Sequence, residues 1–210
     1  MNAELTTQVM EAGGPAVEAA ARVLARGGLV AFRTETVYGL GADAGNGEAV
    51  ARLYEAKGRP SFNPLIAHVA DAAAAHRLAH FDTAAERLAA AFWPGALTLV
   101  LRRRPDCPVA GLATAGLDTI GVRVPSDPVA HGILREFGRA VAAPSANRSG
   151  HVSATTAAHV LADLRGRIDL IVDAGPTAAV PTTVIDLALP PPTLVRLGGG
   201  DPARLGLSLA

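Results

Sequence analysis

The only lysine of the chain lies two residues before an arginine, and the two cations together suit an anionic ligand. Lys57 and Arg59 stand in EAKGRPSFNPL, at the end of a helical pattern and before an apolar run. An ammonium is a compact point charge and a guanidinium is a flat two-pronged donor, so the pair can bind different oxygens of one polyanion. Basic residues also close helix C-termini by complementing the helix dipole. The local spacing leaves both explanations open.

A further arginine, Arg123, stands inside the apolar strand pattern TIGVRVP. An unpaired charge buried in a sheet is costly, so we expect this guanidinium to meet an anion. A sheet-edge or solvent-facing arginine is the alternative. Together with Lys57, Arg59 and Arg196 of LVRLGGG, Arg123 would make a shared site cationic.

Polar side chains recur where strands are expected to end and loops to begin, in TETVYGLG, KGRPSFNPLIAHV, APSANRSGHVS and PTTVIDL. These residues are Thr34, Glu35, Thr36, Tyr38, Asn63, His68, Ser145, Asn147, Ser153, Thr182 and Thr183. Loops beside the strand ends of an open α/β sheet converge on one crevice, so we expect these side chains to share a site. Cations with hydroxyls and amides suit a nucleoside triphosphate bound beside a small zwitterion.

The helices that would position these residues can be predicted from their caps and periodicity. One runs from Pro15 to a stop at Gly27, and a second runs near residues 47–56 with Asn46 as its cap. In DTAAERLAAAFWPG, Thr83 and Glu86 have capping-box spacing, and Trp93-Pro94-Gly95 ends the helix. Two more helices are expected near residues 129–137 and 155–164.

Short apolar runs predict strands between these helices. They are LVAF, LIAHV, LTLVLR, TIGVRV, AVAAP, DLIVD and TTVIDL, and RTETVYGLGADAGNG is predicted to be a loop. Strands interleaved with helices indicate an α/β layer fold. Because some connections are short and others long, we expect a twisted mixed sheet with flanking helices, in a single domain over 1–210.

Composition and missing motifs exclude several functions. The chain has 19 Lys plus Arg against 19 Asp plus Glu and only 4% aromatic residues, which disfavours a dedicated nucleic-acid binder. The lone Cys107 excludes an internal disulfide and a multi-cysteine zinc site. No Gly-Lys-Ser/Thr or H-E-x-x-H occurs. The apolar runs are too short to cross a bilayer, and the N-terminal residues lack a signal pattern, so we expect a cytoplasmic protein.

The ordered series TETVYGLG, KGRP..NPL, FWPGALTLVL, GVRVP, PSAN.SG..S and PTTVIDL resembles the YrdC-like family of L-threonylcarbamoyl-AMP synthases, over roughly residues 16–199. The resemblance implies a YrdC-like fold with a concave cationic face. It also implies a reaction in which L-threonine, bicarbonate or CO₂, and ATP give threonylcarbamoyl-AMP and pyrophosphate. Downstream proteins then transfer the threonylcarbamoyl group to the adenosine beside the anticodon of tRNA, and tRNA itself could contact the enzyme.

Two groups of site residues follow from the resemblance. For L-threonine they are Thr36, His68, Arg123 as a bidentate clamp on the carboxylate, the backbone of Ala143, and the hydroxyls of Thr182 or Thr183. For ATP they are Lys57, Arg59, Asn63, Thr119, Ser145, Asn147, Ser153 and Arg196, with Lys57 and Arg59 also the catalytic candidates. Mg²⁺ would accompany the triphosphate through phosphate oxygens and water, without a protein metal site.

Departures from the family and rival functions complete the expectations. Arg33 replaces the proline usual before TETVYGLG, and Thr182-Thr183 replaces a Ser-Thr pair. The length of the chain matches the short, single-domain members. The main alternative is a non-catalytic module that binds double-stranded RNA or tRNA, with Arg102, Arg103 and Arg104 as its best feature. A carbamoyl-transfer role in hydrogenase maturation is disfavoured because no zinc-finger-like or acylphosphatase-like segment is found.

Overall fold

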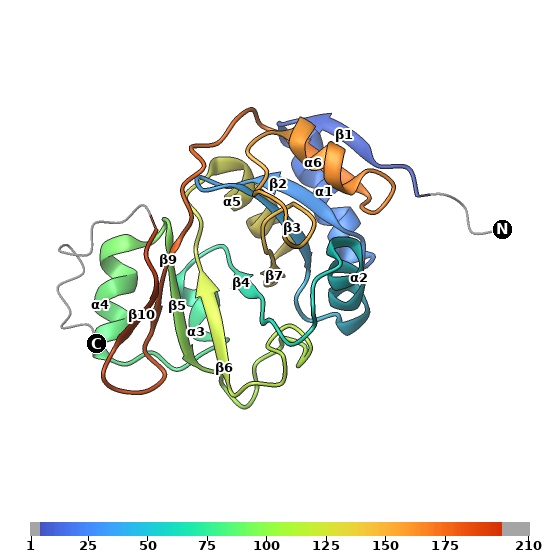
Figure 1. Cartoon of the computed structure of the whole chain (residues 1–210). Coiled ribbons are helices and arrows are strands. Elements are labelled where there is room, and N and C mark those ends of the chain that lie inside the picture. Colours follow the sequence, from blue (N-terminus) through green and yellow to red (C-terminus); the bar gives the residue numbers. More distant parts are fainter. Residues whose placement is uncertain (1–4, 199–210) are drawn as a thin grey trace.

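The structure, a computed structural model, describes residues 5–198, and within them ten strands form one sheet (Figure 1). The strand order is β1-β8-β2-β3-β7-β4-β6-β5-β9-β10. The strands are β1 (Gln8–Glu11), β2 (Val30–Arg33), β3 (Tyr38–Asp43), β4 (Ile66–His68), β5 (Leu97–Arg102), β6 (Thr119–Arg123), β7 (Val141–Ala142), β8 (Leu170–Asp173), β9 (Thr183–Asp186) and β10 (Thr193–Arg196). The helices are α1 (Gly14–Ala25), α2 (Gly47–Lys57), α3 (Ala72–His76), α4 (Thr83–Phe92), α5 (Pro128–Phe137) and α6 (Ala157–Leu164).

The sheet is mixed, which confirms the predicted α/β class. Strand β8 runs parallel to both β1 and β2, and β4 runs parallel to β6. Strand β3 is antiparallel to β2 and to β7, and β5 is antiparallel to β6 but parallel to β9. The predicted domain ends, residues 1–4 and 199–210, lie outside the described residues.

Two hydrophobic clusters cover the two faces of the sheet. Alternate residues of β2 point to opposite faces, so Val30 and Phe32 join one cluster while Ala31 joins the other. Helices α1 and α5 supply Leu24 and Ile133 to the first cluster. The second and larger cluster receives buried side chains from α2, α3, α4 and α6. Helices therefore cover both faces, and the polar residues of the site lie in loops and at the ends of strands.

Side-chain caps fix the beginnings of most helices. Asn46 accepts hydrogen bonds from the backbone N–H groups of Glu48 and Ala49 at 3.0 and 3.2 Å, as predicted for α2. The predicted capping box at Thr83 is wrong. Asp82 caps α4 by accepting from the N–H of Ala85 at 2.8 Å, and Thr83 is already helical. The carboxylate of Asp82 supplies the acceptor expected from Thr83, so the helix begins one residue earlier than a Thr83 cap would allow.

Strand β3 lies in a segment that the sequence predicts to be a loop, and this prediction is wrong. Its glycines weaken the strand signal, but the fold needs one of them. A Cβ on Gly41 would lie 2.7 Å from Cε1 of Phe32 and 2.9 Å from Cγ1 of Val141. The bare backbone of β3 therefore lets large side chains of its two neighbouring strands close over it. Strands β1 and β10 and helix α3 were not predicted either.

Between residues 5 and 198, no helix combines the length and apolar character needed to span a bilayer.

Candidate active site

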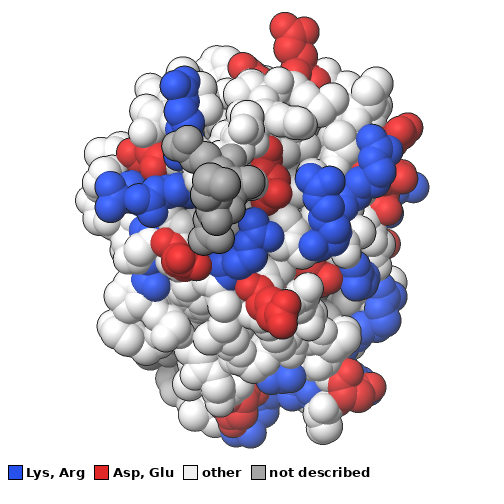
Figure 2. Space-filling model, turned by 90° about the vertical axis from the view of Figure 1, so that its right-hand side faces the viewer, with Lys and Arg blue, Asp and Glu red and all other residues white. Residues whose placement is uncertain are grey.

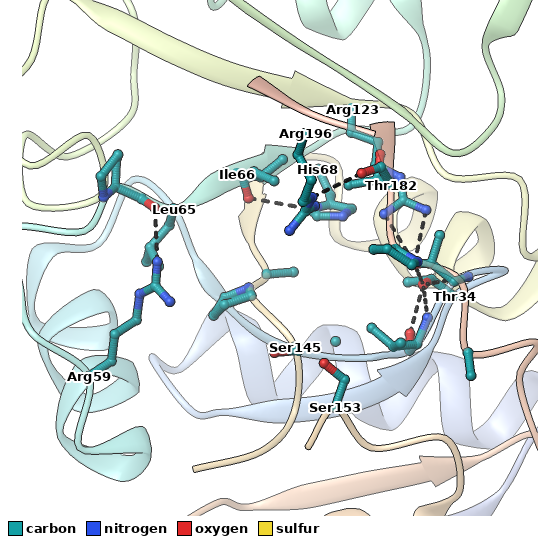
Figure 3. Close-up of a pocket in the computed structure, with 18 residues that line it drawn as sticks. Thr34, Arg59, Leu65, Ile66, His68, Arg123, Ser145, Ser153, Thr182 and Arg196 are labelled. Carbon is teal, nitrogen blue, oxygen red and sulfur yellow. Dashed lines mark hydrogen bonds between the residues drawn. The ribbon is translucent and has the colours of Figure 1, made fainter. Parts of the chain in front are cut away.

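A cavity of about 320 Å³ lies where loops from distant parts of the chain meet (Figure 3). It is lined by the β2–β3 loop, the segment leading into β4, the last residue of β6, the loop after β7, and the segments around β9 and β10. The lining residues are Thr34, Thr36, Val37, Gly39, Arg59, Pro64, Leu65, Ile66, His68, Arg123, Ala143, Pro144, Ser145, Ser153, Ala179, Pro181, Thr182 and Arg196. The convergence expected from the sequence is therefore present for most of the predicted site residues.

Arg123, the last residue of β6, is buried at one end of the cavity, and the protein holds its guanidinium firmly. Its Nη2 donates to Oε1 of Glu35 at 2.5 Å, and its Nε donates to the carbonyl of Gly95 at 3.2 Å. Nη1 and Nη2 both donate to Oγ1 of Thr36, each at 3.3 Å. The buried cation thus meets an anion, Glu35, as its place in an apolar strand requires.

These contacts limit how Arg123 can bind a ligand. A guanidinium has five N–H donors, and four of them are used here, which leaves one N–H on Nη1. A bidentate clamp on a carboxylate, as predicted from the sequence, would therefore require Glu35 or Thr36 to give up its contact. In the arrangement described, Arg123 offers a ligand one donor and a positive field.

The β2–β3 loop is organised by its own hydroxyls. Thr34 Oγ1 must donate to the carbonyl of Val37, 2.7 Å away, because a carbonyl can only accept. The hydroxyl of Thr36 therefore donates to Thr34 Oγ1, also at 2.7 Å, while its lone pairs face Arg123. Thr36 lines the cavity, but its hydroxyl orients Arg123 in this structure. Direct binding of a ligand by this hydroxyl stays a prediction.

His68, at the end of β4, presents a neutral imidazole to the same end of the cavity. It is 2% exposed, and burial, followed by the charge of Arg123, lowers the pKa of His68 to about 3. Its Nδ1 lies 3.2 Å from the carbonyl of Ile66, so Nδ1 carries the proton and Nε2 is the free acceptor. His68 can accept a hydrogen bond from an ammonium or hydroxyl group in the cavity.

Arg196 and Thr182 close this end of the cavity from the C-terminal strands. Nε of Arg196 donates to the carbonyl of Thr182 at 3.0 Å. Desolvation and then the charge of Arg123 lower the pKa of Arg196, because the two guanidinium groups repel each other. The hydroxyl of Thr182 donates to the carbonyl of Thr183. Two arginines whose charges repel create a site that an anion would stabilise.

Arg59 lies at the other end of the cavity, beyond Leu65, while Ser145 and Ser153 lie along its side (Figure 3). Nη2 of Arg59 donates weakly to the carbonyl of Pro64 at 3.4 Å, and its buried Nε has no partner among the described residues. Within the described residues, Arg59 and Arg196 thus each keep four N–H donors for a ligand, against one on Arg123. The cavity is elongated, with Arg123 and His68 at one end and Arg59 at the other.

Lys57 does not line the cavity in this structure, and its predicted roles in ATP binding and catalysis stay predictions. It is the last residue of α2, and it is buried with its Nζ donating to the backbone carbonyl of Ser145 at 2.5 Å and to that of Asn147. Burial, and then the charge of Arg59, lower the pKa of Lys57 to about 8. In this structure the ammonium binds the loop rather than facing the cavity.

Four more predicted residues lie outside the cavity lining. Asn147 is buried and donates from Nδ2 to the carbonyls of Arg148 and His151, and Thr183 accepts through Oγ1 from the N–H of Gly198. Asn63 and Thr119 lie near the Arg59 end, because β4 and β6 are parallel with Ile66 opposite Gly121. A ligand longer than the cavity would extend toward them, so their roles stay predictions.

Residue chemistry alone missed the apolar and backbone part of the lining. Val37, Gly39, Leu65 and Ile66 form walls of the cavity. Only their position within TETVYGLG and KGRPSFNPLIAHV could have indicated them. Tyr38, one of the polar residues of TETVYGLG, points away from the cavity. Its hydroxyl donates to the carbonyl of Gly175 at 2.8 Å and so supports the segment that leads to β9.

Arg33, which replaces the proline usual in the family, is part of the framework. Its Nε forms an ion pair with Oδ2 of Asp127 at 2.8 Å, and its Nη1 donates to the carbonyl of Ala174. The same aspartate caps α5 by accepting from the N–H of Val129 at 2.9 Å. The strand that leads into the β2–β3 loop is thereby attached to α5 and to the segment after β8.

The charged lining of the cavity is basic. Among the described lining residues Arg59, Arg123 and Arg196 carry charge, and neither Asp nor Glu is present. His, Cys, Asp and Glu side chains form no group of three or more that could hold a metal ion within residues 5–198. On the face shown in Figure 2, by contrast, Lys and Arg side chains lie among Asp and Glu side chains.

Comparison with known proteins identifies the family. The model of the family Sua5_yciO_yrdC, described as "Telomere recombination", matches residues 22–198. The chain belongs to the Sua5/YciO/YrdC family. This confirms the resemblance seen in the six sequence segments. The match covers every element that contributes to the cavity.

Individual relatives agree with the family model in sequence and in structure. Threonylcarbamoyl-AMP synthase of Bacillus subtilis is 49% identical over 195 residues, which are 92% of this chain and 56% of that protein. The structure of Pyrococcus abyssi Sua5 complexed with L-threonine matches with a TM-score of 0.86 and 46% identity, over 93% of this chain and 57% of that one. Escherichia coli YciO matches with a TM-score of 0.84 and 26% identity, over 94% and 97%. The chain thus spans little more than half the length of the first two.

Proposed function

We propose that the chain makes threonylcarbamoyl-AMP and pyrophosphate from L-threonine, bicarbonate or CO₂, and ATP. The observation that carries the proposal is the meeting of Thr36, His68, Arg123, Ser145 and Arg196 in one cavity of a family member. Relatives 49% identical to the chain are named threonylcarbamoyl-AMP synthase, and a Sua5 structure holds L-threonine.

L-threonine would bind at the Arg123 end. Its carboxylate would accept from the remaining N–H of Arg123, and the exposed guanidinium of Arg196 lies close enough to share the negative charge. The neutral Nε2 of His68 would accept from the ammonium or the hydroxyl of the amino acid. A neutral acceptor beside a buried arginine tolerates a positive ammonium that a charged histidine would repel.

ATP would bind from the serine-lined side toward Arg59. The hydroxyls of Ser145 and Ser153 and the free donors of Arg59 suit phosphate oxygens, and Asn63 and Thr119 lie beyond Arg59, where the nucleotide would leave the cavity. Without a carboxylate in the described lining, Mg²⁺ would be held by phosphate oxygens and water. The metal would neutralise charge on the triphosphate.

The chemistry needs positioning and charge neutralisation more than a nucleophilic side chain. The amine of threonine adds to CO₂ and loses a proton, which gives an N-carboxylate. An oxygen of this carboxylate attacks the α-phosphorus, and the bond from that phosphorus to pyrophosphate breaks. Preorganised donors at the two ends of the cavity would hold the reactants in line. We also propose that the product passes to cytoplasmic proteins that transfer the threonylcarbamoyl group to tRNA.

The test is pyrophosphate release by the full chain, with each substrate left out in turn. We expect release only when L-threonine, bicarbonate and ATP are all present, and a dependence on Mg²⁺. Pyrophosphate release at the same rate with and without L-threonine would contradict the proposal. No release, together with RNA affinity that falls steeply with salt, would instead favour the RNA-binding alternative.

A further inference from the structure

The buried ammonium of Lys57 joins the end of α2 to the loop 145–147 that follows β7. Lys57 is 3% exposed, and its Nζ donates to the carbonyls of Ser145 and Asn147. The backbone carbonyl of Lys57 in turn accepts from the N–H of Ser149 at 2.8 Å. One residue therefore contacts the loop at two carbonyls and the chain just after it at Ser149. Ser145, which lines the cavity, is flanked by backbone hydrogen bonds to β3 at Pro144 and Ala146, and Lys57 adds contacts with the carbonyls of Ser145 and Asn147.

The chain uses arginine at every other basic position, eighteen of the nineteen Lys and Arg residues. General scarcity of lysine does not explain why the one exception lies here. Two carbonyls on alternate residues of one loop converge on a single point, and a tetrahedral ammonium can donate to both from that point. A guanidinium is larger and presents its donors in a flat fork, so it would not fit the same buried space.

We propose that Lys57 is a positioning residue: it sets the conformation of the loop 145–147, so that Ser145 faces the cavity, and does not itself contact the nucleotide. The inference about the loop stands on the geometry alone, and its effect on catalysis rests on the proposed function. Lys57 acts through the backbone of Ser145, and Arg59 remains the cation that faces the ligand.

The rest of the loop is held independently from outside. Oδ2 of Asp163 on α6 accepts from the N–H of Arg148 at 3.0 Å, and its Oδ1 pairs with Nδ1 of His151 at 3.0 Å. Asp163 and Arg59 are also the charged groups that act on Lys57, the first favouring and the second opposing its protonation. Removing the Lys57 clamp should therefore loosen residues 145–147 while the segment around Arg148 stays attached to α6.

The experiment compares Lys57→Met, Lys57→Arg and the matched control Arg148→Met in the full chain without ligand. Arg148 is an exposed cation of the same loop that takes no part in the clamp. Amide hydrogen exchange at Ala146, whose N–H donates to the carbonyl of Tyr38, should rise about tenfold or more in both Lys57 variants and stay unchanged in Arg148→Met. The rate of pyrophosphate release should fall in both Lys57 variants, in which exchange rises. The arginine of Lys57→Arg should not restore it.

Two results would overturn the inference. If Lys57→Met lowers the affinity for ATP while exchange in the loop stays at the wild-type rate, Lys57 binds the nucleotide directly. If Lys57→Met changes neither exchange nor activity, the clamp has no role. Loosening of the loop in a chain whose wild type releases no pyrophosphate would refute the proposed function and leave the positioning role intact.

A measurement on the wild type covers the case in which the variants do not fold. The ¹³C′ chemical shifts of Ser145 and Asn147 should titrate together, with a midpoint at the pKa of Lys57, about 8, because charge-assisted hydrogen bonds weaken when the ammonium loses its proton. Titration of one carbonyl shift without the other would overturn the proposal. The corresponding shifts in Arg148→Met should follow the wild type.

Discussion

The structure contains a second cavity of similar size, and the comparison shows what makes the first one a site. The second cavity, of about 340 Å³, lies between α3 and the end of α5 and is lined by Arg77, Arg135 and Arg139. It is therefore as large and as rich in arginine as the candidate active site. Volume and arginine content alone do not separate the two, although Asp71 adds a carboxylate to the lining of the second cavity.

Burial and fixed geometry do separate them. The side chain of Arg123 is 4% exposed and is held by Glu35, Thr36 and Gly95. That of Arg139 is 57% exposed, pairs with Asp43 and lies over the ring of Phe137. Arg135 lies in the last turn of α5, where a cation complements the helix dipole without a ligand. Buried polar groups that other residues hold in place are costly to assemble, and they mark the cavity where chemistry is expected.

The largest expected effect contrasts the two ion-paired arginines. Arg123→Met should lower threonine-dependent pyrophosphate release by on the order of 10²-fold, because it removes a preorganised cation from a buried site. Arg139→Met removes an arginine of the second cavity that is also paired with a carboxylate, and should change the rate less than about twofold. Steady-state kinetics at varied threonine concentration measure both. Equal losses in the two variants would abolish the distinction between the cavities.

A smaller effect tests the desolvation of the first cavity through His68. Its pKa is about 3 in the folded chain and 6.5 ordinarily, so between these values the unfolded chain binds a proton that the folded chain does not. The free energy of unfolding should therefore fall as the pH is lowered from 6.5 toward 3. At pH 5 the loss from this residue is about 2 kcal/mol.

The His68 prediction is checked by urea unfolding at pH 7.5 and 5.0 in the wild type and in His68→Gln. The wild type should lose about 2 kcal/mol more than the variant on acidification, since glutamine does not titrate. His131, whose ring Nε2 donates to the carbonyl of Ala70 at 2.6 Å outside the cavity, offers a matched His131→Gln control. An identical pH dependence in the wild type and His68→Gln would show that His68 is solvated.

The smallest expected effect is in the second cavity. The double variant Arg77→Ala and Arg135→Ala removes two exposed cations that form no ion pair among the described residues. The free energy of unfolding should change by no more than about 0.5 kcal/mol, and so should the activation free energy that corresponds to the rate of pyrophosphate release. Pyrophosphate release and urea unfolding measure the two quantities. A large loss of activity here would mean that exposed arginines at helix ends contribute to the reaction.

Much of the framework could be predicted from the sequence because its signals are local. Asn46 and the α2 periodicity indicated a helix that the structure contains, and the strands LTLVLR and TIGVRV lie where expected. Strand β3 could not be predicted, since Gly39 and Gly41 read as loop residues. The reason for Gly41, the packing of Phe32 and Val141 above it, exists only in the folded sheet.

The residue types of the site were predictable, but their contacts were not. Arg59, Arg123, His68 and Ser145 line one cavity as the polar segments indicated. The sequence does not show that Glu35 accepts a hydrogen bond from Arg123. Nor does it show that the ammonium of Lys57 donates to a loop about 90 residues later in the chain. Such contacts join residues far apart in the sequence, and no local pattern encodes them.

The strand order also determines when the cavity can exist during synthesis of the protein. Thr182 and Arg196 reach it only after β9 has aligned beside β5 and β10 beside β9. A nascent chain that has already folded α1 to β8 still lacks this wall. Translation must proceed past Arg196 before the complete ligand pocket can close, so a ribosome-bound fragment without these strands would have the framework but only part of the site.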